Sequence, residues 1–186
     1  TQQVALNTQF YYFDFIVNPS LSGTQDYNPI YLSYRNQWTG FNGSPETIHV
    51  GGNYALNSYN GIGVQFFQDN HGGSYKQSGI TLNYAKHFII KENIYLSVGA
   101  GALVDQFSGD YSGLELSNSS DNTYLVGQES KVLADAVLGF NLSLNRFNVG
   151  LSATNLLQSK VSNNNFQGND NNLKRQYNLL CGYILP

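Results

Sequence analysis

The chain has 186 residues, enough for one domain, and only 11% of them are charged while 14% are aromatic. Soluble surfaces usually carry charge on roughly 25 to 35% of their residues, and the frequent aromatic and glycine residues favour β-structure. The formal net charge of -3 argues against a nucleic-acid partner, and the single cysteine, Cys181, can form no internal disulfide. No segment approaches the roughly 20 consecutive apolar residues of a membrane-spanning helix, which excludes a helical membrane protein.

The first 27 residues predict an ordered lead-in that precedes the strands. They hold the aromatic cluster Phe10 to Phe13, and then the turn-forming pairs Asn18-Pro19 and Ser22-Gly23. The polar start at Thr1 is typical of a mature exported chain, so we expect a cleaved signal peptide before it. We therefore divide the chain into a lead-in over residues 1–27 and a barrel over residues 28–186.

From residue 28 onward, apolar and polar residues alternate with the period of two that is typical of strands. The pattern predicts eight antiparallel strands, over about residues 28–38, 46–56, 61–70, 78–90, 94–106, 131–144, 147–157 and 174–185. Lys86 falls among the apolar positions of the fourth strand, and a β-bulge there would explain it.

Two features favour a transmembrane outer-membrane β-barrel over a soluble, lipocalin-like one. The non-apolar face of the strands is mostly Gly, Ser, Asn, Thr and Ala, as expected of a crowded lumen and not of a water-facing surface. Short connections after the second, fourth and sixth strands alternate with longer ones, as periplasmic turns alternate with extracellular loops. The lead-in would then be periplasmic, with Trp38 and Phe41 as aromatic anchors at the outer interface.

Five ionisable residues share the predicted lumen face in the outward halves of their strands. We expect a layer of structural charges whose members are paired, since charges in a confined lumen persist only if they are paired or hydrated. Binding or gating is the alternative role. The five are Arg35, His49, Asp69, Asp105 and Asp135.

The sequence offers little support for an enzyme, a cofactor or a metal site. Ser33, His49 and either Asn53 or Asp69 are the only loose candidates for an outer-membrane lipid hydrolase, but His49 is predicted to face the lumen, whereas the catalytic histidine of such barrels must face lipid. The acidic loop 107–130 lacks the order of a known calcium loop, so we expect a solvated loop, with calcium binding as the alternative.

Several motifs resemble the PorP/SprF family of Bacteroidetes outer-membrane proteins associated with type IX secretion. The strongest is Tyr34-Arg35-Asn36-Gln37-Trp38 followed by a glycine and proline turn, similar to that family's first hairpin. The others are Asn18-Pro19 with Gly23, Gly61-Ile62-Gly63-Val64 with Asp69-Asn70, Leu82 to His87, Val149 to Ser152 with Leu156-Leu157, Arg175-Gln176-Tyr177, and Gly182-Tyr183.

The resemblance implies a non-enzymatic barrel of the type IX secretion and gliding machinery. Its expected partners are outer-membrane lipid, other secretion components, and the C-terminal domain of a secreted, adhesin-like surface protein. A generic small barrel or channel is the alternative. We predict that the partner docks on the two longest loops, with Tyr111, Tyr124 and Phe166 as its aromatic contacts.

Overall fold

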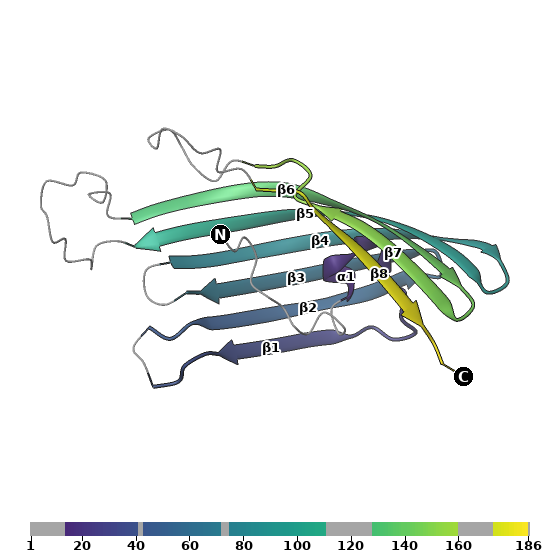
Figure 1. The fold of residues 1–186 in the computed structure, drawn as a ribbon, viewed down its shortest axis with the longest axis horizontal. Helices are drawn as coiled ribbons and strands as arrows, with labels where there is room; N and C mark the ends of the chain where they lie inside the picture. The colour runs from purple at the N-terminus through teal and green to yellow at the C-terminus, as the bar shows by residue number, and fades with distance from the viewer. Residues whose placement is uncertain (1–13, 41–42, 72–74, 111–127, 160–172, 186) are drawn as a thin grey trace, which may run out of the picture.

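The computed structural model describes residues 14–40, 43–71, 75–110, 128–159 and 173–185. They form one sheet of eight strands in sequence order, each antiparallel to the next, curled into the open half-barrel shown in Figure 1. The predicted all-β fold of eight antiparallel strands is therefore confirmed. The strands are β1 (Ile30–Asn36), β2 (Glu46–Asn57), β3 (Asn60–Asn70), β4 (Tyr75–Lys91), β5 (Ile94–Asp110), β6 (Gln128–Leu144), β7 (Phe147–Thr154) and β8 (Gln176–Tyr183).

Burial in the sheet is the reverse of that in a water-soluble protein. On the convex face large apolar side chains are exposed, including Leu82 at 54%, Phe140 at 52% and Leu151 at 55%. On the concave face the buried side chains are mostly polar, including Gln65 and Asn141, each at 4%. Buried polar groups are costly unless they are hydrogen-bonded, so this face must carry its own polar network.

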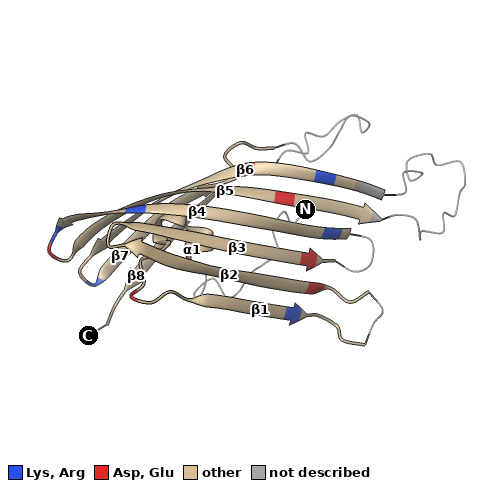
Figure 2. Ribbon diagram, turned by 180° about the vertical axis from the view of Figure 1, so that it is seen from behind, with Lys and Arg blue, Asp and Glu red and all other residues tan. Residues whose placement is uncertain are grey.

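Short hairpins close one end of the sheet, and the longer connections gather at the other end (Figure 1). Asn93 and Asn145 adopt the left-handed conformation in two of these hairpins, with φ of 64° and 54°. Asparagine tolerates that conformation better than most residues do, which suits it to tight turns. Charged residues lie mainly toward the two ends of the strands, as Figure 2 shows.

The middle strands are longer than the sequence pattern predicts. β5 continues to Asp110 and β6 begins at Gln128, so the connection between them is shorter than the predicted 107–130. β7 ends at Thr154 and not at residue 157, because Asn155 turns the chain with φ of 56° and Leu156 donates its backbone N–H to the carbonyl of Ala136 on β6 at 3.1 Å.

The predicted bulge at Lys86 was wrong. β4 stays in register with both neighbours there, with Lys86 opposite Asn60 on β3 and Val98 on β5. The register shifts of these strands lie elsewhere, between Ala55 and Asn57 and between Ile89 and Lys91. Lys86 therefore projects from the convex face among apolar side chains.

The described part of the lead-in packs against the concave face. It forms one turn of α-helix, α1 (Asp14–Val17), and a short 3₁₀ helix, η1 (Pro19–Leu21), which lies on β4, β5 and β6. Figure 1 shows α1 inside the curve of the sheet. No helix in the described ranges has the length and apolar character needed to cross a membrane.

Candidate functional site

Asn18 anchors the lead-in to the sheet and is fully buried. Its Nδ2 donates to the carbonyl of Phe140 on β6 at 3.0 Å. Its Oδ1 accepts from the backbone N–H and the hydroxyl of Ser20, at 3.1 and 2.7 Å, which caps η1. The same side chain thus folds the lead-in locally and fixes it to a distant strand.

Glycines on the concave face provide the space in which the lead-in lies. A Cβ on Gly139 would overlap Asn18 Oδ1, a Cβ on Gly99 would overlap the backbone of Ser20, and a Cβ on Gly61 would overlap the carbonyl of Ser22. Each of these positions requires glycine because backbone or buried atoms occupy the place of a side chain. We call this row of glycines, completed by Gly63, the glycine track.

Four side chains from three strands, β2, β4 and β7, bind the lead-in backbone along the glycine track. Each bond satisfies a main-chain group that would otherwise be buried without a partner. The bonds are Asn83 Nδ2 to the Phe15 carbonyl at 2.9 Å, Ser152 Oγ to the Val17 carbonyl at 2.6 Å, His87 Nε2 to the Ser22 carbonyl at 3.1 Å, and the Gly23 N–H to Asn53 Oδ1 at 3.1 Å.

Asp14 is the one ionisable group of the lead-in near the concave face among the described residues. Burial raises the pKa of this carboxyl to about 6 from 3.8, although its hydrogen bond from the Phe15 N–H, at 2.8 Å, acts in the opposite direction. Burial disfavours the charged form, so docking and ionisation of Asp14 oppose each other.

Asp69 and His49 lie on the concave face between the glycine track and the longer connections. Asp69 is 4% exposed; it accepts from Thr47 Oγ1 at 2.8 Å and pairs with His71 Nε2 at 3.4 Å. His49 Nδ1 accepts from Gln65 Nε2 at 3.1 Å, and its ring stacks on Phe67 with centroids 6.0 Å apart. Each group has a local partner on its own or the next strand.

Asp105 and Asp135 lie on the same face, on β5 and β6. Asp135 is 3% exposed, and its Oδ1 accepts from the backbone N–H groups of Leu157 and Ala136, at 2.8 and 2.7 Å. It therefore ties the start of the connection between β7 and β8 to β6. Asp105 lies beside Gln77 and Gly79 of β4, and its Oδ1 is buried and has no hydrogen bond.

Arg35, the fifth residue of the predicted charge layer, lies on the exposed edge strand β1. Its Nε donates to the side-chain oxygen of Gln37 at 2.8 Å, with that amide turned to present its oxygen. In the described parts of the chain, Thr47 and His71 contact the carboxylate of Asp69, and backbone N–H groups donate to that of Asp135. No ion pair joins Arg35 to either carboxylate there. Thr47 separates Arg35 from Asp69 in the register of the sheet.

Some predicted contact residues can be placed and others cannot. Trp38 is 73% exposed and follows β1 with a positive φ of 57°. Phe41, Tyr111, Tyr124 and Phe166 lie outside the described residues. The bases of the two longest connections are nevertheless defined, because Phe107, Leu133 and Leu173 form a buried apolar cluster there.

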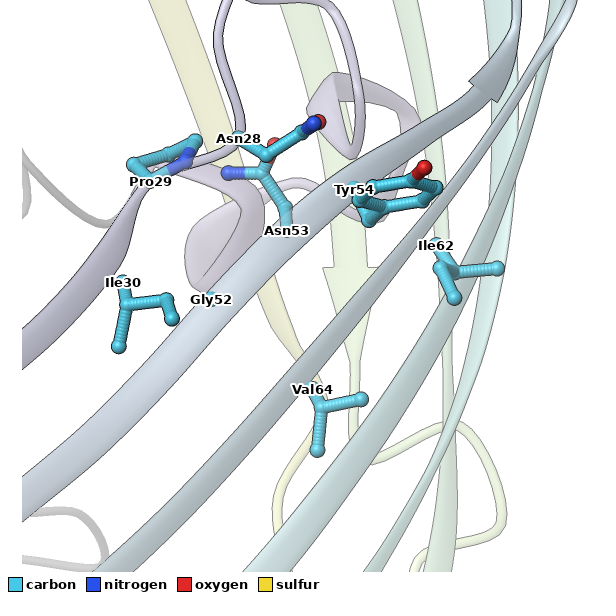
Figure 3. Close-up of a pocket in the computed structure, with 8 residues that line it drawn as sticks. All are labelled: Asn28, Pro29, Ile30, Gly52, Asn53, Tyr54, Ile62 and Val64. Carbon is cyan, nitrogen blue, oxygen red and sulfur yellow. The ribbon is translucent and has the colours of Figure 1, made fainter.

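Of the candidate hydrolase residues, Asn53 lines the pocket drawn in Figure 3, whereas Ser33, His49 and Asp69 do not. Ser33 and His49 are register partners on β1 and β2, but the pocket of about 240 Å³ drawn in Figure 3 lies at the beginning of β1, around Gly52, between Ile30, Tyr54, Ile62 and Val64. Its walls are mainly apolar. Among the described residues no three His, Cys, Asp or Glu side chains are placed to hold a metal ion.

The sequence pattern predicted a periplasmic lead-in but not its packing on the concave face, although two signals for that packing were present. Gly61, Gly63, Gly99 and Gly139 all share one strand face, which indicates close approach of another backbone. Asn18-Pro19-Ser20 has the form of a capped turn, which favours a fixed conformation. Neither signal by itself predicts that the turn packs on the glycines, because that contact links distant parts of the chain.

Comparison with known proteins assigns the chain to a family. Neither the curated proteins nor the solved structures gave a match to the chain. The family model described as "Type IX secretion system membrane protein PorP/SprF" matches residues 1–186, the whole chain. The chain therefore belongs to the PorP/SprF family of type IX secretion system membrane proteins.

Proposed function

We propose that this protein is a non-enzymatic outer-membrane barrel of the type IX secretion and gliding machinery. In this role it assists the export or surface attachment of a secreted, adhesin-like protein by binding that protein's C-terminal domain. The family supports a membrane component of the secretion system. The outer-membrane location and the secreted partner are the additional steps, and each rests on features of the sheet.

The reversed burial supports a membrane location for the sheet. Exposed apolar side chains on the convex face, such as Leu138 at 45% and Phe140 at 52%, match lipid, while the concave face buries polar ones. A transmembrane barrel alternates apolar residues outside with polar residues inside, and it has short periplasmic turns and longer extracellular loops. In this orientation the lead-in enters from the periplasmic side.

The lead-in fills the concave face, and this observation carries the proposal. It favours a protein that binds a partner over one that conducts solutes. Phe15, Asn18, Pro19, Ser20 and Ser22 are fully buried against the sheet, so the lead-in occupies the space that a channel would need. The seat for Asn18 is shaped by Gly139, where even a methyl group would not fit. A partner must then bind at a surface of the barrel.

The two longest connections are the proposed docking surface. They leave the sheet from a common base, where Phe107, Leu133 and Leu173 pack together and the Leu173 N–H donates to the Ser159 carbonyl at 3.2 Å. Tyr111, Tyr124 and Phe166 belong to these connections, and aromatic residues are frequent interface hot spots. A fixed base would present both loops to one partner.

Co-purification tests this role most directly. Residues 111–127 and 160–172 would be replaced together by short Gly-Ser linkers, and the partner's C-terminal domain would be quantified in detergent extracts. We expect the partner to be lost while the barrel remains in the outer membrane. Tyr111→Ala, Tyr124→Ala and Phe166→Ala combined should weaken binding at least tenfold, with Ser119→Ala and Ser120→Ala as the matched control.

Retention of the partner at the wild-type level would contradict the loop site and would direct attention to the aromatic cluster Phe10 to Phe13 of the lead-in. Absence of any secreted protein from extracts of the wild-type barrel, under conditions that keep other secretion components bound, would favour a generic barrel instead.

A further inference from the structure

Lys86 is a cation on the convex face, which would meet hydrocarbon if the sheet is part of a membrane barrel. It is exposed on the convex side of β4, where the neighbouring outward residues are Leu82, Tyr84 and Phe88, which are 54%, 48% and 45% exposed. A charged side chain is expensive among lipid tails, and such residues persist when they reach the interface or an opposite charge.

The contacts of Lys86 leave its charge without an anionic partner in the described parts of the chain. Its Nζ donates to Asn60 Oδ1 at 3.3 Å, and the ion pair found among the described residues is that of Asp69 with His71. An ammonium has three donors and Asn60 accepts from one. The remaining donors face the surroundings of the convex surface.

A small polar cluster holds Lys86 on the convex face, where Phe88 and Ile90 are exposed beyond it toward the end of the strand. Tyr84 donates its hydroxyl to the same Asn60 Oδ1 at 2.7 Å, and Asn60 Nδ2 donates to Asn57 Oδ1 at 2.7 Å. Asn60 is the first residue of β3, so Lys86 lies level with the short hairpin between β2 and β3. Tyrosine beside lysine at such a level is typical of a membrane interface.

The spacing along β4 agrees with that depth. Lys76 projects from the same face as Lys86 near the other end of the strand, and Ile80 and Leu82 lie between them. Ten residues at about 3.3 Å each, tilted by about 40°, span about 25 Å along the barrel axis, which is the height of the apolar band of an outer-membrane barrel. The two lysines are therefore separated by about one hydrocarbon thickness.

We propose that Lys86, held by Asn60 and Tyr84, binds the phosphate of an anionic phospholipid in the periplasmic leaflet. The inference rests on the proposed membrane location of the sheet. A lipid phosphate supplies both the negative charge and the acceptor oxygens that Asn60 cannot provide. Because the cluster is built from three side chains on two strands, it favours one lipid position on the barrel surface.

A local quenching measurement tests this site. In the full chain with Cys181→Ala, Val98→Cys would place a fluorophore on the outward residue opposite Lys86, and the protein would be folded into phosphatidylcholine vesicles. Nitroxide-labelled phosphatidylglycerol should quench this probe at about one-fifth of the concentration needed with nitroxide-labelled phosphatidylcholine. A probe at Leu179→Cys on β8, at the same register level as Lys86 but four strands away, serves as the remote control and should show no preference.

Lys86→Gln should remove the fivefold preference at position 98, and Lys86→Arg should keep it. Lys91→Gln, at the end of the same strand, should leave it unchanged. An unchanged preference in Lys86→Gln would overturn the proposal, as would its loss when inorganic phosphate is added at constant ionic strength, which would indicate a site for free phosphate. Quenching by neither lipid would instead contradict the membrane location on which the site depends.

Discussion

Asn18 of the lead-in donates a hydrogen bond to the carbonyl of Phe140 at 3.0 Å, across 122 residues of sequence. The bond crosses the concave face at the point where Gly139 and Gly150 leave room for the asparagine side chain. It fixes the lead-in to the concave face of the half-barrel. The stability of the sheet and the position of the lead-in should therefore change together.

Gly139→Ala should displace the lead-in, because its new methyl group would overlap Asn18 Oδ1. Overpacking of this kind costs about 1 to 3 kcal/mol, and we expect faster proteolysis of the lead-in and a lower urea midpoint in detergent. Gly182→Ala is the matched control, because its Cβ would meet Asn148 at an ordinary 3.9 Å. Equal protection of the lead-in in both variants would show that Gly139 does not seat Asn18.

Asp135→Ala should destabilise the protein more than Arg35→Ala does. Removing the buried carboxylate leaves the partly buried N–H groups of Leu157 and Ala136 without their acceptor, at a cost of about 1 to 3 kcal/mol. Arg35 is exposed and contacts Gln37, so its removal should cost less than about 1 kcal/mol, and Arg35→Lys should be nearly neutral. Urea unfolding in detergent micelles measures all three. The reverse order would restore the ion-paired layer that the sequence pattern predicts.

Docking of the lead-in should weaken as the pH rises. The docked pKa of Asp14, about 6, lies above its free value of 3.8, so the docked state favours the protonated carboxyl. The resulting stabilisation is complete below the free pKa and is lost as the pH rises through 6. Amide hydrogen exchange of residues 15–22 should therefore be slower near pH 5 than near pH 8, after correction for intrinsic rates.

Asp14→Asn should remove this pH dependence and protect the lead-in at neutral pH. Asp26→Asn, on an exposed side chain of the same segment, should leave it in place. The same pH dependence in Asp14→Asn as in the wild type would assign the effect to another group.

Leu138→Arg should cost about 2 to 4 kcal/mol if the convex face meets the middle of a bilayer. Leu138 is 45% exposed near the middle of the outward row of β6. Val132→Arg, on the same row near the longer connections, should cost no more than about 1 kcal/mol because arginine there reaches the interface. Reversible unfolding in lipid vesicles gives both values. Similar small costs at the two positions would show that this face does not meet hydrocarbon.

The regular part of the fold could be predicted from sequence because the strand pattern is local. Alternation from Val132 to Leu144 defines β6 and its outward face without knowledge of any partner. The ends of the strands were less predictable, since the end of β7 depends on a bond from Leu156 to Ala136 of the neighbouring strand. The Lys86 error has a different origin, because an outward lysine can bind Asn60 on the neighbouring strand without any backbone irregularity.

The partners of the lumen carboxylates could not be predicted from face and charge alone. Asp69, Asp135 and Arg35 fall on one predicted face, which suggests ion pairs. A hydroxyl, a histidine and backbone N–H groups nevertheless lie nearer to the two aspartates. The contact between the lead-in and the sheet could not be predicted for a related reason, because it joins residues that are far apart in the sequence. Asn18 Nδ2, for example, closely approaches Gly150, which is 132 residues away.

The central claim is that the sheet is a membrane barrel with lipid outside and its own lead-in inside. The most direct test compares folding of the full chain, diluted from urea, into buffer and into phospholipid vesicles, monitored by heat-modifiable gel mobility and by protease protection of the strands. We predict a protected, heat-modifiable form with vesicles and aggregated, protease-sensitive chain in buffer. A folded, protease-resistant monomer in buffer without lipid or detergent would contradict this claim.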